Sequence, residues 1–179
     1  MTKAKKDDEL VFLPLGGSNE IGMNFNLYGF GPPHDRKWIV VDLGITFGDQ
    51  TTPGVEVILP DPTFMEENAD RLLGIVLTHA HEDHIGAIPY LLRERADIPL
   101  VGSKLTLGLI GSKLVEHRVK QIPVLSARMI RFAKRGHPAR NITTLAGALG
   151  IVGNRGLETV LLELLEDLTV LRADIEGQQ

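Results

Sequence analysis

Three histidines and an aspartate lie within six residues of this chain, in the segment His79-Ala-His-Glu-Asp-His84. Imidazole nitrogens and carboxylate oxygens are ligands for zinc and other borderline divalent metals. The chain has no cysteine, which excludes disulfides and thiolate metal sites, so any metal must be held by His, Asp or Glu. The segment therefore predicts a metal site, and the alternative interpretation is a polar turn that is merely rich in histidine.

The spacing of these residues suggests two metals close together. His79 and His81 are two apart in an extended segment, so they point to one side of the chain. Asp83 and His84 lie where the chain turns and can face a second position, while Glu82 is a spacer that points away. Paired metals can activate a bridging hydroxide. They can also stabilise the attacking and the leaving oxygen when a phosphodiester is hydrolysed. We therefore assign His79 and His81 to one metal and the catalytic pair Asp83 and His84 to the other.

Four ligands are too few for two catalytic metals, because each usually takes about three protein ligands plus water. Other parts of the chain must supply the remainder. His137 lies at a plausible distance downstream and is a candidate for an extra ligand, although no expected strand precedes it. Asp42 ends an apolar run, as a residue at the end of a buried strand would, and we expect it to accept a hydrogen bond that orients a ligand histidine.

The metal segment follows an expected buried strand at 72–77 and precedes an expected helix at 85–95. Other apolar runs predict strands at 10–15, 23–28, 38–41, 99–101 and 121–125. Helices are expected after Asp61, which can cap one, and from Ser103 to about His117. Residues 43–60 are expected to form a long loop. Antiparallel strands followed by alternating strands and helices predict a layered α/β fold.

The ends of the chain differ in character from this region. We expect a disordered leader at 1–9, a domain at 10–125, and a tail at 126–179 that is first basic and then acidic and helical. Leucines recur at helical spacing from Leu157 to Leu171. This helix is expected to dock on the core, and the alternative is that it forms the contact of a homo-oligomer.

The net charge of −4 conceals a basic block. No acidic residue stands between Glu116 and Glu158, an interval that holds eight of the 19 basic residues. A basic block on an acidic chain suggests a polyanionic partner, with a solvated surface as the alternative. The residues of this block that we predict to contact RNA are Arg128, Arg131, Lys134, Arg135 and Arg140.

The first ten residues are charged and lack the apolar stretch of a secretory signal. No run in the sequence approaches the length of a membrane span. Together with the absence of cysteine, this leads us to expect a cytoplasmic protein with no membrane partner.

The pattern His79-x-His81-x-Asp83-His84 after an apolar strand resembles the signature of the metallo-β-lactamase superfamily. Its flanks narrow the resemblance to ribonuclease J, of the β-CASP group. The segments that carry this resemblance are 13–24 (LPLGGSNEIGMN), 38–44 (WIVVDLG), 53–62 (PGVEVILPDP), 74–90 (GIVLTHAHEDHIGAIPY) and 105–114 (LTLGLIGSKL). It covers about residues 10–118.

The resemblance implies the first half of an αββα sandwich with two zinc ions, followed here by a helical tail. It implies cleavage of RNA both internally and from the 5′ end. By the same resemblance, His79, His81, Asp83 and His84 are metal ligands, and Asp42 matches the residue that supports the site.

The sequence also departs from that family. Family members are far longer, carry an inserted β-CASP domain, and supply a further His, a bridging Asp and a late His that are not found here. We therefore expect the opening part of such a protein joined to an unrelated tail. One alternative is a non-catalytic remnant that binds metal or RNA weakly. Another is a related hydrolase of thioesters or lactones, which fits the histidine segment but not its flanks.

Overall fold

The computed structural model describes residues 7–93, 95, 97–119 and 122–126, and every structural statement below concerns these residues. Most of the expected leader, most of the tail at 126–179 and the helix predicted at 157–171 lie outside them. His137 and the predicted RNA contacts Arg128, Arg131, Lys134, Arg135 and Arg140 also lie outside the described residues.

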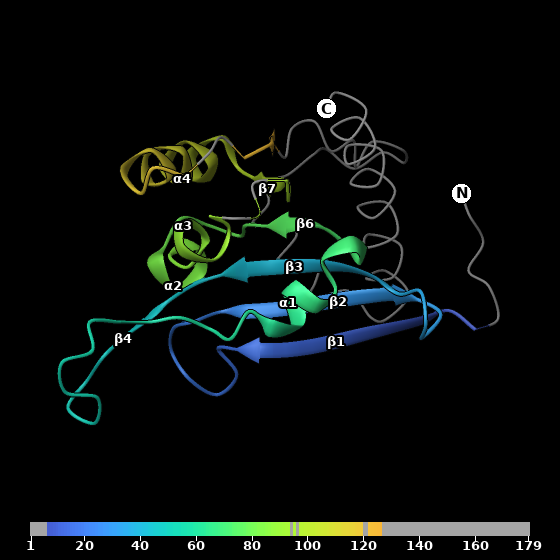
Figure 1. The fold of residues 1–179 in the computed structure, drawn as a ribbon, viewed down its shortest axis with the longest axis horizontal. Helices are drawn as coiled ribbons and strands as arrows, with labels where there is room; N and C mark the ends of the chain where they lie inside the picture. The colour runs from blue at the N-terminus through green and yellow to red at the C-terminus, as the bar shows by residue number, and fades with distance from the viewer. Residues whose placement is uncertain (1–6, 94, 96, 120–121, 127–179) are drawn as a thin grey trace, which may run out of the picture.

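A six-stranded mixed sheet forms the centre of the fold, in the order β1-β2-β3-β6-β7-β8 (Figure 1). Its strands are β1 (Glu9–Gly16), β2 (Phe25–Gly31), β3 (Lys37–Leu43), β6 (Leu72–Val76), β7 (Leu100–Gly102) and β8 (Val124–Ser126). The first three pair antiparallel, and β6, β7 and β8 are added in parallel. This is the expected change from antiparallel strands to strands alternating with helices.

The helices are short, apart from the last. They are α1 (Thr63–Glu67), a 3-10 turn at Ala69–Arg71, α2 (Glu82–Ile85), α3 (Ile88–Leu91) and α4 (Lys104–Glu116). Ser103 caps α4 as predicted, because its hydroxyl accepts a hydrogen bond of 3.1 Å from the Thr106 N–H. At α1 the N-cap is Pro62 and not the expected Asp61, which lies one residue earlier; its carboxylate accepts a bond of 2.9 Å from the Thr63 N–H.

The core lies between one face of the sheet and the helices. Alternate strand residues such as Leu27, Val40 and Ile75 are fully buried and belong to one cluster with Met65 of α1 and Ile110 of α4. Side chains of opposite parity on a strand point to the other face. Helices therefore cover one face of a mixed sheet, and the fold class expected from the sequence is confirmed for the described residues.

Two further local predictions were wrong. The helix expected at 85–95 is two short helices, α2 and α3, and α2 already begins at Glu82 within the metal segment. The interruption lies at Gly86 and Ala87, where the Ala87 N–H donates to the Leu43 carbonyl at 3.1 Å instead of continuing α2. Pro89 in the first turn of α3 has no N–H to donate to the Ile85 carbonyl. The loop expected at 43–60 contains a two-stranded ribbon of β4 (Thr46–Phe47) and β5 (Val57–Ile58).

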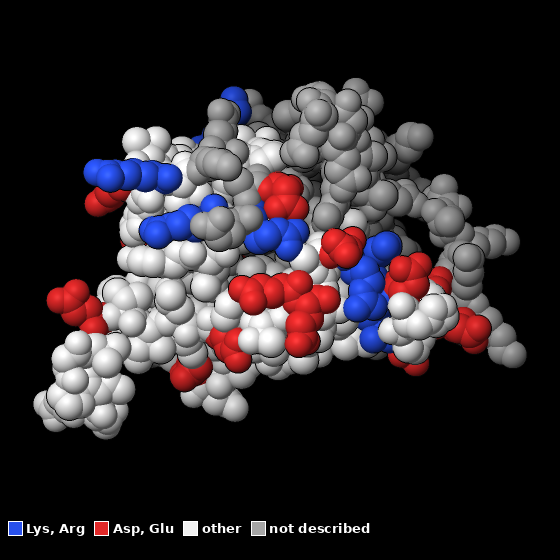
Figure 2. All heavy atoms as spheres, viewed as in Figure 1, with Lys and Arg blue, Asp and Glu red and all other residues white. Residues whose placement is uncertain are grey.

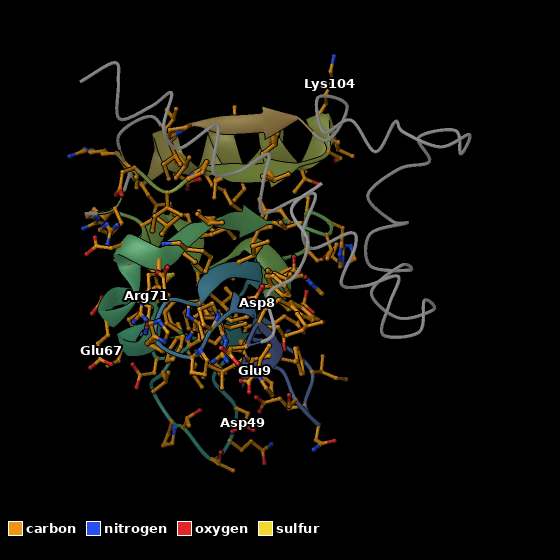
Figure 3. The ribbon with its side chains drawn as sticks, turned by 90° about the vertical axis from the view of Figure 1, so that its right-hand side faces the viewer. Asp8, Glu9, Asp49, Glu67, Arg71 and Lys104 are labelled. Atoms are coloured by element: carbon orange, nitrogen blue, oxygen red, sulfur yellow. The ribbon has the colours of Figure 1, made fainter. Side chains whose placement is uncertain are left out.

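The ribbon and α4 lie at the lower and upper edges of the molecule in Figures 1 and 3, although both lie towards the same end of its longest axis in Figure 1. Figure 3 shows Asp49, from the turn that follows β4, at the lower edge and Lys104, at the start of α4, at the upper edge. Acidic side chains gather on the face over α1, a helix that contains Glu66 and Glu67 (Figure 2). In the part of the chain that is described, no helix is both long and apolar enough to cross a bilayer.

Candidate metal centre

The predicted metal segment begins where two parallel strands end. β3 and β6 are neighbours in the sheet, with Val41 beside Val76, and the chain leaves β6 through Leu77 and Thr78 into His79. Figure 1 shows α2 and α3 beyond the arrowheads of β3 and β6. The ends of parallel strands thus place residues about 40 apart in the sequence at one edge of the sheet, where ligand sites commonly form.

A bulge in β3 turns Asp42 towards this edge. On the neighbouring strand, Phe25 pairs with Leu43 and Asn26 pairs with Val41, so Asp42 is an extra residue without a partner in β2. Its φ is 62°, a left-handed conformation that Asp tolerates better than most residues. A bulge of this kind re-aims a side chain. Here it directs the Asp42 side chain, which is 6% exposed, into the candidate site.

The Asp42 carboxylate connects three groups of the site. Its Oδ1 accepts a hydrogen bond of 2.8 Å from the Thr78 backbone N–H, and its Oδ2 accepts one of 2.8 Å from the Thr78 hydroxyl. Its Oδ2 also lies 2.7 Å from Nδ1 of His84. Since a carboxylate only accepts, Nδ1 carries the proton and Nε2 is the nitrogen left for a metal. Asp42 therefore fixes both the ring and its tautomer.

The pKa values of two histidines move in opposite directions. Burial lowers the pKa of His84, but the hydrogen bond and charge of Asp42, with the charge of Asp83, outweigh it and raise that pKa above its ordinary value. Although His79 is largely exposed, partial desolvation lowers its pKa, and the neighbouring His84 and His81 lower that pKa further against the attraction of Asp42 and Asp83. His79 is therefore more readily neutral, the form in which a histidine binds a metal.

The three histidine rings lie against one another. The ring centroids of His79 and His84 are 4.0 Å apart, and those of His79 and His81 are 4.5 Å apart. His79 Nδ1 lies 3.0 Å from the Thr78 hydroxyl, which is itself bonded to Asp42. His79 and His81 are exposed, whereas Asp83 and His84 are half-buried.

One pair of donor atoms has the separation that a metal needs. Nε2 of His84 lies 3.3 Å from Oδ2 of Asp83. Two ligands about 2.0 Å from a tetrahedral zinc lie about 3.3 Å apart, so both atoms fit one ion. Among the described residues, however, no group of three or more His, Cys, Asp or Glu side chains is arranged to hold a metal ion. The donor types and this pair fit a divalent cation, while the assignment of all four residues as ligands stays a prediction.

The turn that carries Asp83 and His84 packs closely against the backbone that precedes β2 and the backbone that follows β3. The Ile45 N–H donates to the Glu82 carbonyl at 3.1 Å, and the Asn24 N–H donates to the Asp83 carbonyl at 2.9 Å. A Cβ atom on Gly44 would lie 1.8 Å from the Asp83 carbonyl oxygen. Only glycine fits at position 44, because any side chain there would overlap the Asp83 carbonyl. The absence of a side chain lets the turn that carries Asp83 lie directly against the backbone of Gly44.

The Glu82 side chain contacts α4 and not the metal-ligand side chains. Its Oε1 lies 2.6 Å from Nζ of Lys113, and both side chains are partly exposed. This agrees with the expectation that Glu82 points away from the metal ligands. The ion pair ties α4 to the start of α2.

The site thus contains Asp42, His79, His81, Asp83 and His84, which the sequence singled out. It also contains Thr78, Gly44 and Asn24, which had no assigned role. A signal for two of them existed, since Gly44 and Asn24 end two of the segments that carry the resemblance. Their roles depend on contacts between distant segments, which a motif does not display.

A protein-family model described as "Metallo-beta-lactamase superfamily" matches residues 27–166. The match includes the whole candidate site except Asn24, and it runs past Arg118, where the resemblance was expected to end.

Curated relatives named "Ribonuclease J" also match the chain. The protein of Sinorhizobium meliloti is 46% identical over 131 residues, which are 69% of this chain and 23% of the relative. That of Mycolicibacterium smegmatis is 48% identical over 106 residues, which are 59% of this chain and 18% of the relative. The chain therefore spans about a fifth of the length of these relatives.

Among solved structures, the short form of human tRNase Z is 18% identical, with a TM-score of 0.41 over 66% of this chain and 45% of that chain. A quorum-quenching N-acyl homoserine lactone hydrolase is 13% identical, with a TM-score of 0.40 over 69% of this chain and 59% of that chain.

Proposed function

The chain belongs to the metallo-beta-lactamase superfamily, and from this premise we propose that it hydrolyses phosphodiester bonds of RNA with a bound divalent metal. The observation that carries the proposal is the 46% identity to a ribonuclease J over 69% of the chain. Any stretch of that length within 179 residues includes residues 79–84. The similarity therefore extends over the histidine segment of the candidate metal centre.

We assign the metal to the four residues of the histidine segment, with zinc as the ion and two ions as the expected number. His79 and His81 would hold one ion, and Asp83 and His84 the other. Support comes from the donor types and from the separation of 3.3 Å between His84 Nε2 and Asp83 Oδ2. Such ions supply a hydroxide at neutral pH and neutralise charge on the phosphate.

The protein's own part in this reaction is to hold ligands and protons in place. Asp42 keeps the proton of His84 on Nδ1, which leaves Nε2 to face the metal. Thr78 links that same carboxylate to His79. Burial of Asp42 keeps water from competing for these hydrogen bonds.

RNA is the proposed substrate and partner. The face over α1 gathers acidic side chains (Figure 2), which repel phosphate, so we place RNA elsewhere. The proposed contacts are Arg128, Arg131, Lys134, Arg135 and Arg140, which lie outside the described residues. We propose that the protein cleaves RNA both internally and from the 5′ end of the RNA.

A test combines metal analysis with RNA cleavage. The purified chain is loaded with Zn²⁺, its zinc content is measured, and it is incubated with a 5′-monophosphorylated linear RNA and with a circular RNA. We expect metal-dependent loss of both substrates. Loss of the circular RNA reports internal cleavage, because a circle has no 5′ end, and the linear RNA also offers a 5′ end. His81→Ala should abolish cleavage, and His34→Ala, which changes an exposed histidine of the β2–β3 turn, should not.

A second function is favoured by one observation, that no three donors converge within the described residues. The chain would then bind metal or RNA without turnover. Zinc-loaded protein that leaves both RNAs intact would overturn the hydrolase and support this alternative. Thioester and lactone substrates assayed beside RNA would detect the related hydrolase activity.

A further inference from the structure

Asn24, just before β2, is bonded to the turn that carries the donor pair. Its backbone N–H donates to the Asp83 carbonyl at 2.9 Å, and its side-chain Nδ2 donates to the same oxygen at 3.0 Å. On the other side, the Gly44 N–H donates to the Asn24 carbonyl at 2.9 Å. Asn24 is thus held between the end of β3 and the start of α2.

The side-chain amide also lies beside both donor atoms. Because the Asp83 carbonyl can only accept, the nitrogen of the amide must be the atom that faces it. That nitrogen is 3.5 Å from Asp83 Oδ2 and 3.3 Å from His84 Nε2. Asn24 therefore contacts the carbonyl, the carboxylate and the ring that define the donor pair.

The two donors differ in what holds them. His84 is fixed through Nδ1 by the buried Asp42. For the Asp83 carboxylate, the polar contacts within the described residues are to Asn24 and His84. Its side chain is 34% exposed, so it could otherwise rotate into water. Apart from His84 itself, Asn24 is the side chain of the described residues that contacts Oδ2, at 3.5 Å.

We propose that Asn24 is a positioning residue for the metal, one that holds Asp83 and His84 with Oδ2 and Nε2 facing a common point. It acts through these two residues and is not itself a ligand. The inference rests on the metal-binding part of the proposed function, and it does not depend on whether RNA is the substrate.

The test measures Zn²⁺ affinity by competition with a chromophoric chelator, without RNA. Asn24→Ala and Asn24→Leu remove the amide while leaving the backbone bonds to Asp83 and Gly44 in place. The loss of a group that orients a metal ligand typically weakens binding about 10–100-fold, and we expect both variants to fall in that range. Asn26→Leu, two residues along in β2, makes the same change away from the site and should retain the affinity of the unaltered chain.

Unchanged or tighter binding in the Asn24 variants would overturn the proposal, and so would an equal loss in Asn26→Leu or a chain that binds no Zn²⁺. Thermal unfolding of each variant separates loss of affinity from loss of fold.

If the variants do not fold, an NMR experiment on the unaltered chain tests the proposal. Zn²⁺ should shift the side-chain amide resonances of Asn24 and leave those of Asn26 in place. No shift at Asn24 would overturn the role. RNA cleavage assayed separately reports on the proposed function alone.

Discussion

Oδ2 of Asp42 lies 2.7 Å from Nδ1 of His84, although 42 residues separate the two in the chain. The contact exists because a bulge at the end of β3 turns Asp42 to the edge of the sheet where α2 begins. It decides which nitrogen of His84 is available to a metal.

This contact predicts a pH dependence in the metal-free protein. The pKa of His84 is raised above its ordinary value, so the folded state favours the imidazolium. The resulting stabilisation is fully present below about pH 6.5 and is lost as the pH rises through the raised pKa. Asp42→Asn keeps the shape but not the charge. In the presence of chelator, its deficit in free energy of unfolding should be larger at acidic than at alkaline pH.

Urea unfolding at several pH values measures this deficit, and NMR titration of the histidine ring protons gives the pKa of His84 directly. That pKa should fall in Asp42→Asn. A deficit that is the same at all pH values would contradict the assigned role of the charge.

The close packing at Gly44 predicts that a single methyl group disturbs the site. In Gly44→Ala the added Cβ would overlap the Asp83 carbonyl, so the turn must move. We expect a loss of about 1–3 kcal/mol in free energy of unfolding and weaker Zn²⁺ binding. Gly111→Ala is the matched control, because Gly111 lies in α4 and a Cβ atom added there would meet nothing within 4 Å. It should be neutral or stabilise by up to about 1 kcal/mol through helix propensity. Equal effects of the two substitutions on Zn²⁺ binding would refute the packing argument.

Leu77, between β6 and the metal segment, is fully buried in the core. Leu77→Ala should lower the free energy of unfolding by about 2–5 kcal/mol, because it removes buried apolar surface and leaves a cavity. The same substitution at Leu105 of α4, which is 72% exposed, should cost under about 0.5 kcal/mol. Denaturant titrations compare the two, and a small effect at Leu77 would show that the site does not rest on this core.

The ion pair of Glu82 and Lys113 should contribute little to stability, since both side chains are partly exposed. Lys113→Ala is expected to cost at most about 1 kcal/mol. The cost should shrink in high salt, which screens exposed charges. A double-mutant cycle with Glu82→Ala at low and high salt measures the coupling energy. A coupling energy that salt leaves unchanged would show that the pair is not screened as its exposure implies.

Local signals in the sequence accounted for much of the fold. The cap at Ser103 and the alternation of apolar residues in β2 depend on neighbours a few residues away, so each was predicted from its own segment. The break between α2 and α3 was missed, although Pro89 in the first turn of α3 is a local sign of it. The bond from the Ala87 N–H to the Leu43 carbonyl, which replaces a bond of the helix, joins distant segments and has no local signal. The ribbon of β4 and β5 was missed because strands of two residues carry almost no periodic signal.

The sequence by itself determined the donor chemistry: histidines and aspartate at short spacing, with no thiol to compete, after a buried strand. It also singled out Asp42 from its place at the end of an apolar run. Only the tertiary structure decided how these groups meet. The bulge that aims Asp42 arises from the register between β2 and β3, and the amide of Asn24 meets Asp83 across 59 residues of chain. Such contacts follow from how strands pair and pack, and pairing between distant segments is not encoded in the residues of either segment alone.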